Sequence, residues 1–318
     1  MPSLSTPRND MLDQRQLETG VTLNLFEASL DEGTIRQKNT PTDQIQRMVI
    51  TDRNPTSPYK IQVLLRTCIH GTMDIQTKQP ASLIIVDYSI MITKEGARFS
   101  TVDTSFEFSE YLTPAEQAEA AGSFSRGTCP SVIAYAPFEE PVRFNYMASE
   151  ESKKTQLEVK LSPEVAGVKP GEVSFGQERE STYSRRYFDQ GLGGRNFDQN
   201  GCAYRVWWNL IQNKKDNAGV PPKFRVAILL QRTGTGKFQA KFGFAARGGF
   251  GYRLEELTNR WLRRTAVDDP IIFDPSADPI GSDLDGMKID QQELRKLKVG
   301  SELANLGRVW GLNQLQKP

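Results

Sequence analysis

The sequence predicts a mainly β fold, with two packed β-sandwich-like units and a short C-terminal helical segment. Apolar residues alternate with polar ones in several short stretches, and turn residues separate these stretches. A helical period is clear in one place, shortly after residue 250. Many short strands divided by turns are typical of sandwiches and barrels. One large, elaborated sandwich is the alternative to two units.

The strongest strand signals come in two pairs, each around a glycine-containing loop. In the first pair a period of two places the apolar positions of each stretch on one face of a strand. These positions are Ile84, Val86, Tyr88, Ile90 and Ile92, then Val102, Thr104, Phe106 and Phe108. The second pair surrounds the loop TGTG, and its second stretch carries Phe238, Ala240, Phe242 and Phe244 on one face. Both pairs are predicted to be β-hairpins.

Composition and pattern divide the chain into four segments. We expect a disordered tail over 1–18, a first β-sandwich-like unit over 19–150 and a second over 151–266. A helix over 252–265 closes the second unit, because its apolar stripe cannot face water; the stripe is Leu254, Leu257, Trp261 and Leu262. Prolines and aspartates over 267–318 predict an acidic, proline-containing linker and a C-terminal tail, with a short helix between 290 and 298.

Charge and cysteine content limit the partners and the compartment. Forty basic residues balance 39 acidic ones, which gives a net charge of +1 and no global field to attract nucleic acid or an anionic membrane. The three widely spaced cysteines, Cys68, Cys129 and Cys202, form neither a disulfide framework nor a zinc pattern. With no apolar leader and no apolar run long enough to span a bilayer, we expect a cytoplasmic protein, nuclear entry not being excluded.

A single histidine, His70, restricts the enzyme classes open to this chain. Any Ser-His or Cys-His relay has to use it, and a metal site has one imidazole at most. It follows an apolar stretch and precedes Gly71, so we expect a residue at a strand end with no catalytic partner. The sequence predicts no catalytic residue, cofactor or metal, although carboxylate chemistry stays open.

Two glycine-rich segments invite comparison with phosphate-binding loops. TGTGKF fails as a P-loop, because Gln231 replaces the first glycine and Phe238 the magnesium-binding hydroxyl. A second segment between a strand and a helix combines glycines with two arginines, a setting in which helix N-termini bind anions. It comprises Arg247, Gly248, Gly249, Gly251 and Arg253. We take it as the alternative site, for a phosphorylated or nucleotide ligand near 247–253.

The leading candidate for a binding segment combines arginines with aromatic residues. Its members are Tyr183, Arg185, Arg186, Tyr187, Phe188, Arg195 and Phe197, and we expect them on a long surface loop. Arginine and aromatic side chains together commonly bind protein partners, polysaccharide or single-stranded nucleic acid. The near-neutral chain places protein partners ahead of nucleic acid.

Two further features are interpreted structurally. The acidic stretch from Asp268 to Gly286 does not fit a calcium loop, because Gly281 and Gln292 occupy the required acidic positions. Adjacent Trp207 and Trp208 fall on opposite faces of a strand, so one of them belongs to the core.

The order of several segments resembles a family of uncharacterised intracellular proteins of filamentous fungi. The similar segments are ASLIIVDYSIMI, FSTVDTSFEF, SVIAYAP, VWWNLIQNKKDNAGVPPKFRVAILLQR and DDPIIFDP. The resemblance covers residues 58 to 275. It implies a β fold and an intracellular setting, and it supplies no mechanism.

From these observations we expect a non-enzymatic, protein-binding β-sandwich protein. The first alternative is an enzyme of unknown class that binds a phosphorylated or nucleotide ligand near residues 247–253. The second is a carbohydrate- or lipid-binding sandwich, which needs an exposed aromatic platform. The partner's identity and the oligomeric state are left open by the sequence.

Overall fold

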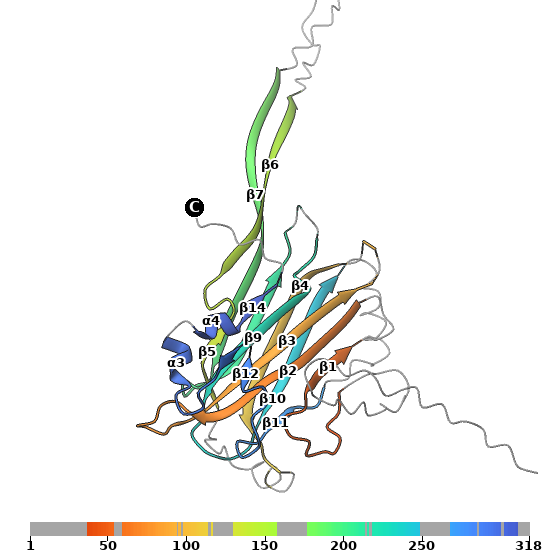
Figure 1. Cartoon of the computed structure of the whole chain (residues 1–318). Coiled ribbons are helices and arrows are strands. Elements are labelled where there is room, and N and C mark those ends of the chain that lie inside the picture. Colours follow the sequence, from red (N-terminus) through yellow and green to blue (C-terminus); the bar gives the residue numbers. More distant parts are fainter. Residues whose placement is uncertain are drawn as a thin grey trace, which may run out of the picture. The chain divides into compact units, whose positions relative to one another are not determined.

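Two antiparallel sheets packed against each other form the body of the structure, a computed structural model (Figure 1). It describes residues 37–53, 59–93, 95–96, 98–113, 116, 130–157, 177–213, 215, 218–248, 268–284, 286–299 and 302–310. The expected mainly β class with packed β layers and a short C-terminal helical segment is confirmed. Within the described ranges, no helix has the length and apolar character needed to cross a membrane.

The first sheet has the strand order β1-β2-β3-β9-β14, and β5 also pairs with β9. Its strands are β1 (Val49–Arg53), β2 (Tyr59–Thr72), β3 (Pro80–Ile92), β5 (Ser131–Ala136), β9 (Lys223–Gln231) and β14 (Arg308–Val309). The second sheet has the order β11-β10-β4-β8-β7-β6. Its strands are β4 (Phe99–Glu110), β6 (Val142–Leu157), β7 (Gln177–Phe197), β8 (Ala203–Ile211), β10 (Phe238–Gly248) and β11 (Ile271–Phe273).

Both predicted hairpins are instead crossings from one sheet to the other. Strand β3 pairs with β2 and β9, whereas β4 pairs with β10 and β8. Likewise β9 and β10, joined by the TGTG loop, lie in different sheets. Apolar alternation and a glycine-containing loop indicate where two successive strands begin and end. They do not indicate which strands each of them pairs with, because those partners come from distant parts of the chain. Each sheet therefore takes strands from both sides of residue 150, which itself lies inside β6.

The space between the two sheets holds the main core. The five alternating residues of β3 lie there as predicted, four of them buried and Ile92 partly buried. Tyr88 stacks on Phe224 of β9 at a ring-centroid distance of 4.2 Å. Its hydroxyl is 2.8 Å from Oγ1 of Thr104 on β4, so the one polar atom that this side chain brings into the core is hydrogen-bonded. The phenylalanines of β4 and β10 fill the opposite side of the same core.

A second core lies on the outer face of the first sheet and uses the C-terminal segment. Ile69 and Ile85, which alternate with the main-core residues of β2 and β3, are fully buried there. The covering side chains are Leu284, Ile289, Leu294, Leu297, Leu303 and Leu306. They come from the strand pair β12 (Asp283–Leu284) and β13 (Met287–Lys288) and from helices α3 (Arg295–Val299) and α4 (Glu302–Leu306) or the turns around them.

The expected acidic linker over 267–318 is thus replaced, between 268 and 310, by a packed segment. Ile271, Ile272 and Phe273 form β11 on the edge of the second sheet, and β14 adds an edge strand to the first. The aspartates misled the sequence prediction because some of them accept hydrogen bonds from distant parts of the chain; Asp268, for example, is buried and accepts from the backbone N–H of Gln37 at 2.9 Å. The expected tail 1–18 and helix 252–265 lie outside the described residues.

Candidate functional site

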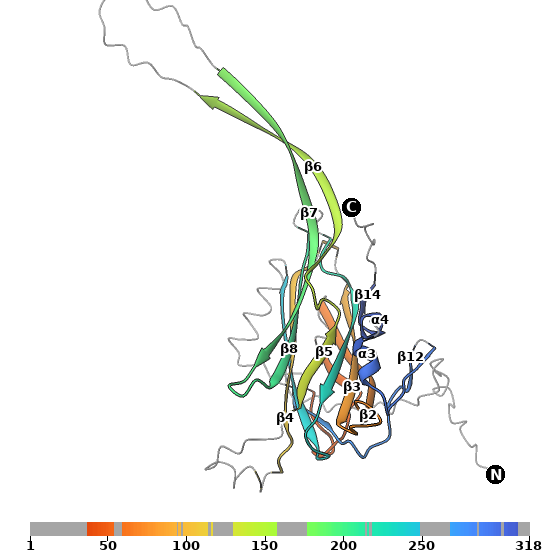
Figure 2. The same ribbon diagram turned by 90° about the vertical axis from the view of Figure 1, so that its left-hand side faces the viewer.

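Strands β6 and β7 continue together past the ends of the other strands in the second sheet (Figure 2). The register between them runs from Met147↔Tyr187 to Leu157↔Gln177, and we call residues 147–157 and 177–187 the ribbon. The pairing of β7 with β8 begins only at Gln190. Among the described residues, each ribbon strand therefore has the other as its sole strand partner.

The base of the ribbon is fixed to the body by close packing and by buried polar contacts. Gly191 lies against the ring of Phe138, where an added Cβ would fall 2.3 Å from a ring carbon. Asp189 is buried, and its carboxylate accepts hydrogen bonds from the side-chain amide of Asn145 and the backbone N–H of Asn213. These contacts explain why glycine and aspartate occur in the segment DQGLGG, where β7 passes from the ribbon into the sheet.

The predicted binding segment lies on strand β7, so the prediction that these residues form a surface loop is wrong. Its first part, Tyr183 to Tyr187, belongs to the ribbon, while Arg195 and Phe197 lie in the body. Arg195 donates from Nη1 to the carbonyls of Val132 and Ile133 on β5, at 3.0 and 3.2 Å, and so ties the second sheet to the first. Phe197 is 58% exposed, and the Arg195 guanidinium lies over its ring, with the guanidinium carbon 5.6 Å from the ring centroid.

Strand periodicity divides the ribbon part of this segment between two faces. Positions two apart share a face, so Tyr183, Arg185 and Tyr187 belong to one and Arg186 to the other. Across the strand pair, Glu151 is the register partner of Tyr183, and Met147 that of Tyr187. Charged residues occur at both odd and even positions of the ribbon sequence, which is unlike the apolar alternation of the strands in the body.

Sequence reasoning missed the β6 half of the ribbon. Strand β6 is continuous from Val142 to Leu157. The missed residues read MASEESKKTQL, with two glutamates followed by two lysines around Ser152. A strand that polar residues fill on both faces has no hydrophobic alternation, so the usual signal for a strand is absent there.

His70 lies inside β2 and belongs to a buried polar cluster. Its Nε2 is 3.4 Å from Sγ of Cys68 and accepts a hydrogen bond from the Gln46 amide at 2.9 Å. The ring proton is therefore on Nδ1, which donates to Oγ of Ser82 at 2.8 Å. The expected strand-end position is wrong, and a cysteine does lie beside the imidazole.

Electrostatics keep this Cys-His pair neutral. Burial, and after it the nearby charge of Arg232, lower the pKa of His70 to about 4 against the opposing effect of Asp274. Burial also raises the pKa of the fully buried Cys68 thiol. A cysteine nucleophile needs the opposite shifts, a lowered thiol pKa and a protonated imidazole. The cluster is accordingly a set of satisfied polar groups at the edge of the core.

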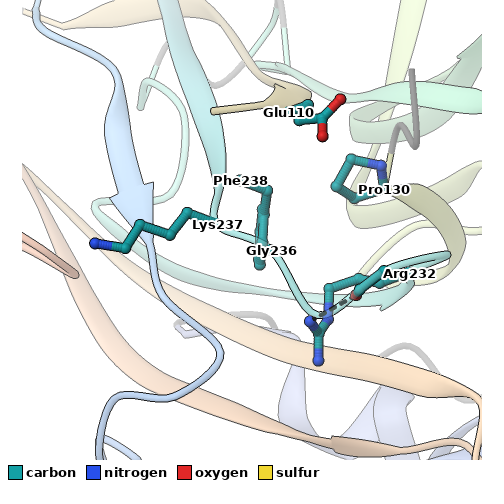
Figure 3. A pocket seen from close by; sticks show the side chains of 7 residues that line it. Glu110, Pro130, Arg232, Gly236, Lys237 and Phe238 are labelled. Atoms are coloured by element: carbon teal, nitrogen blue, oxygen red, sulfur yellow. Dashed lines mark hydrogen bonds between the residues drawn. The ribbon is translucent and has the colours of Figure 1, made fainter. Parts of the chain in front are cut away.

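The TGTG crossing forms a small hollow beside this cluster (Figure 3). Its volume is about 120 Å³, and its lining residues are Glu110, Pro130, Arg232, Gly234, Gly236, Lys237 and Phe238. Arg232 is 5% exposed and donates to the carbonyls of Gly234 and Ala81 at 3.2 and 3.3 Å. Ligand pockets are usually about 300–1,000 Å³, so this hollow is too small for a nucleotide.

The other candidate sites divide between described and undescribed residues. Arg247 and Gly248 end β10, while Gly249, Gly251 and Arg253 lie outside the described residues. Of the tryptophan pair, Trp208 is buried and donates from Nε1 to the Pro137 carbonyl at 3.0 Å, whereas Trp207 is half-buried, as alternation predicts. In the part of the chain that the structure describes, no group of three or more His, Cys, Asp or Glu residues is placed to hold a metal ion.

Comparisons with known proteins add little to this geometry. No family model and no curated protein matches the chain. Among the solved structures that match is the Clostridium perfringens NetB toxin in the membrane inserted form, and the alignment covers 62% of this chain and 75% of the toxin chain. The identity is 8% and the TM-score 0.20, values at which the alignment carries no argument about this chain. The resemblance to the fungal family stays a prediction.

Proposed function

We propose that this protein acts without catalysis, by binding another protein through the ribbon. One observation carries the proposal. Residues 183–187, which we call the Arg/Tyr segment, lie in the part of β7 that extends beyond β8, and among the described strands this part pairs only with β6. A two-stranded antiparallel ribbon is at best marginally stable in water when nothing covers it. A binding partner would supply the missing contacts.

The composition of the ribbon suits a protein partner. Arginine and tyrosine are enriched among the residues that dominate binding energy at protein interfaces. Tyr183, Arg185 and Tyr187 occupy alternate positions of β7, so a partner on that face could contact all three. The outer edges of the ribbon, which pair with no described strand, also suit addition of a strand, a common mode of peptide recognition.

The compartment belongs to the same proposal. Among the described residues, Cys68 and Cys202 form no disulfide, which supports a reducing compartment such as the cytoplasm. The near-balance of charges, at a net +1, supports a protein partner rather than nucleic acid. Neither the hollow at the TGTG crossing nor the end of β10 offers a described site that favours the enzyme alternative.

The proposal is tested by affinity capture with the tagged full chain from native lysate. The variant R185A/Y187A removes two residues of one ribbon face, and the matched control R66A/K241A removes two exposed basic residues of the body. We expect partners retained by the wild type and the control to be lost by R185A/Y187A. If every captured protein is retained by R185A/Y187A, or the control loses the same set, this face is not the binding site.

The enzyme alternative has a separate, inexpensive test. A ligand that binds the folded state raises the melting temperature in proportion to the logarithm of its concentration over Kd. A thermal-shift screen with nucleotides and phosphorylated sugars should therefore leave the melting temperature unchanged. A saturable stabilisation that R247A abolishes would favour the alternative site instead.

A further inference from the structure

Among the described strands, none pairs with the outer edge of β6 along the ribbon. Strand β6 is the last in its sheet, and no described strand pairs with its outer side between Met147 and Leu157. Natural proteins protect such edges, because unpaired N–H and C=O groups are a template for another strand. Pairing with a strand of a second molecule would satisfy this row of backbone groups.

The sequence of this edge is complementary to itself when read in the reverse direction. In an antiparallel pair of two β6 strands related by a two-fold axis at Ser152, positions i and j face each other when they lie equally far on either side of that residue. The facing pairs are Glu151 with Lys153, Glu150 with Lys154, Ser149 with Thr155, Ala148 with Gln156 and Met147 with Leu157. Every charge meets its opposite, and the outermost pair is apolar.

This match depends on the register. Centring the axis on Glu151 or on Lys153 instead would place that residue opposite its own copy, with like charges facing each other. The outer edge of β7 is not complementary in the same way, because a two-fold axis at Thr182 sets Arg179 against Arg185. The β6 edge is therefore charge-complementary when the axis lies on Ser152, and this match is lost when the axis lies on either neighbouring residue.

We propose that two copies of this chain associate through their β6 edges, antiparallel and centred on Ser152, forming a four-stranded sheet of order β7-β6-β6-β7. The proposal rests on the proposed function, since it names a second copy as one protein that the ribbon binds. The pairing of β6 with β7 within each copy adds a further pair of opposite charges, because Glu180 of β7 is the register partner of Lys154. Both β7 edges, with their Arg/Tyr segments, stay open for a further partner.

Charge-reversal variants test the pairing through sedimentation equilibrium of the full chain. E150K/E151K and K153E/K154E each place like charges at every charged pair, so each should weaken self-association at least about tenfold. An equimolar mixture should restore it as a heterodimer, because KKSKK faces EESEE with opposite charges throughout. The variant E150K/E151K/K153E/K154E/E180K keeps opposite charges at every facing pair and at the register pair 154–180, so it should dimerise like the wild type, which also shows that the reversed residues do not prevent folding.

A cysteine pair tests the register directly. Ser152→Cys faces its own copy, and Cα atoms of facing antiparallel residues are about 4.5–5.5 Å apart, within reach of a disulfide. With a copper(II) oxidant as the electron acceptor, two Ser152→Cys thiols should lose their protons and form an intermolecular disulfide. Ser149→Cys, which faces Thr155, is the matched control and should give no more covalent dimer than the wild type.

The outcomes separate this inference from the proposed function. A monomeric wild type at high micromolar concentration, or a dimer that neither reversal weakens, overturns the β6 pairing. In that case capture of another protein that R185A/Y187A loses would still support the ribbon as a binding site. A dimer that follows the charge rules, with no capture sensitive to R185A/Y187A, would support self-association and refute a further partner on β7.

Discussion

Strand β3 in the body and strand β6 in the ribbon are both long antiparallel strands, but they have opposite surroundings. β3 is covered on both faces, with Val86 in the main core and Ile85 in the second core. The ribbon part of β6 has charged residues at successive positions of its sequence and one strand neighbour among the described residues. The difference teaches that the two cores of the body stabilise the fold, whereas the ribbon is an extension that we expect to be stabilised by a binding partner.

The largest expected effect is loss of the C-terminal cover of the body. Truncation after Gly281 removes the six buried side chains Leu284, Ile289, Leu294, Leu297, Leu303 and Leu306. Burying each such side chain contributes about 1.5–3 kcal/mol, and their sum rivals the whole stability of a domain. We expect no soluble, cooperatively melting protein, whereas truncation after Trp310 retains all six. A truncated chain that melts like the full one would show the segment to be dispensable.

The second prediction concerns the outer face of β3. Ile85→Ala removes a fully buried side chain beneath the C-terminal leucines, and it should lower the free energy of unfolding by about 2–5 kcal/mol. Met91→Ala in the same strand is the control, because Met91 is 45% exposed and should cost much less. Urea denaturation measures both. Equal losses would contradict the claim that β3 is covered on both faces.

The third prediction uses the chain's single histidine. Unfolded histidine has a pKa of about 6.5, whereas folded His70 titrates at about 4, so between these values the unfolded state binds a proton that the folded state does not. Stability is therefore full above pH 6.5 and falls as the pH drops towards 4, by roughly 3 kcal/mol at about 1.4 kcal/mol per pH unit.

His70→Gln provides the matched measurement for this pH dependence. Urea denaturation at pH 7 and pH 5.5 should show a stability loss in the wild type and a much smaller one in the variant, since carboxylates hardly titrate in that interval. The same slope in both proteins would mean that His70 is not buried as a neutral imidazole.

The smallest expected effect comes from removing the ribbon. Met147 and Tyr187 are register partners, so an Asn-Gly turn can join them directly in place of residues 148–186. The body keeps both cores, and its melting temperature in dilute solution should change by less than about 4 °C, the shift that 1 kcal/mol produces in a domain of this size. A larger loss would show that the ribbon stabilises the body and would remove the contrast between the two regions.

Local sequence patterns were sufficient to predict the buried positions of strands that have one apolar and one more polar face. Ile84, Val86, Tyr88 and Ile90 are buried together as alternation predicts, and Trp208 is buried while Trp207 is not. The candidate site was found in part, since arginine and tyrosine marked β7. The β6 half was missed because polar and charged residues occupy its successive positions, so it carries no hydrophobic alternation.

By itself the sequence determined that this is a mainly β protein and which residues of β3, β4 and β10 face the main core, because a period of two is a property of consecutive residues. Only the tertiary structure decided that β3 and β4, and likewise β9 and β10, belong to different sheets. The same is true of the leucines after Gly281, which form a second core, and of the Arg/Tyr segment, which lies on an extended ribbon. Strand pairing and coverage are contacts between residues far apart in the chain, and no local pattern specifies the distant partner.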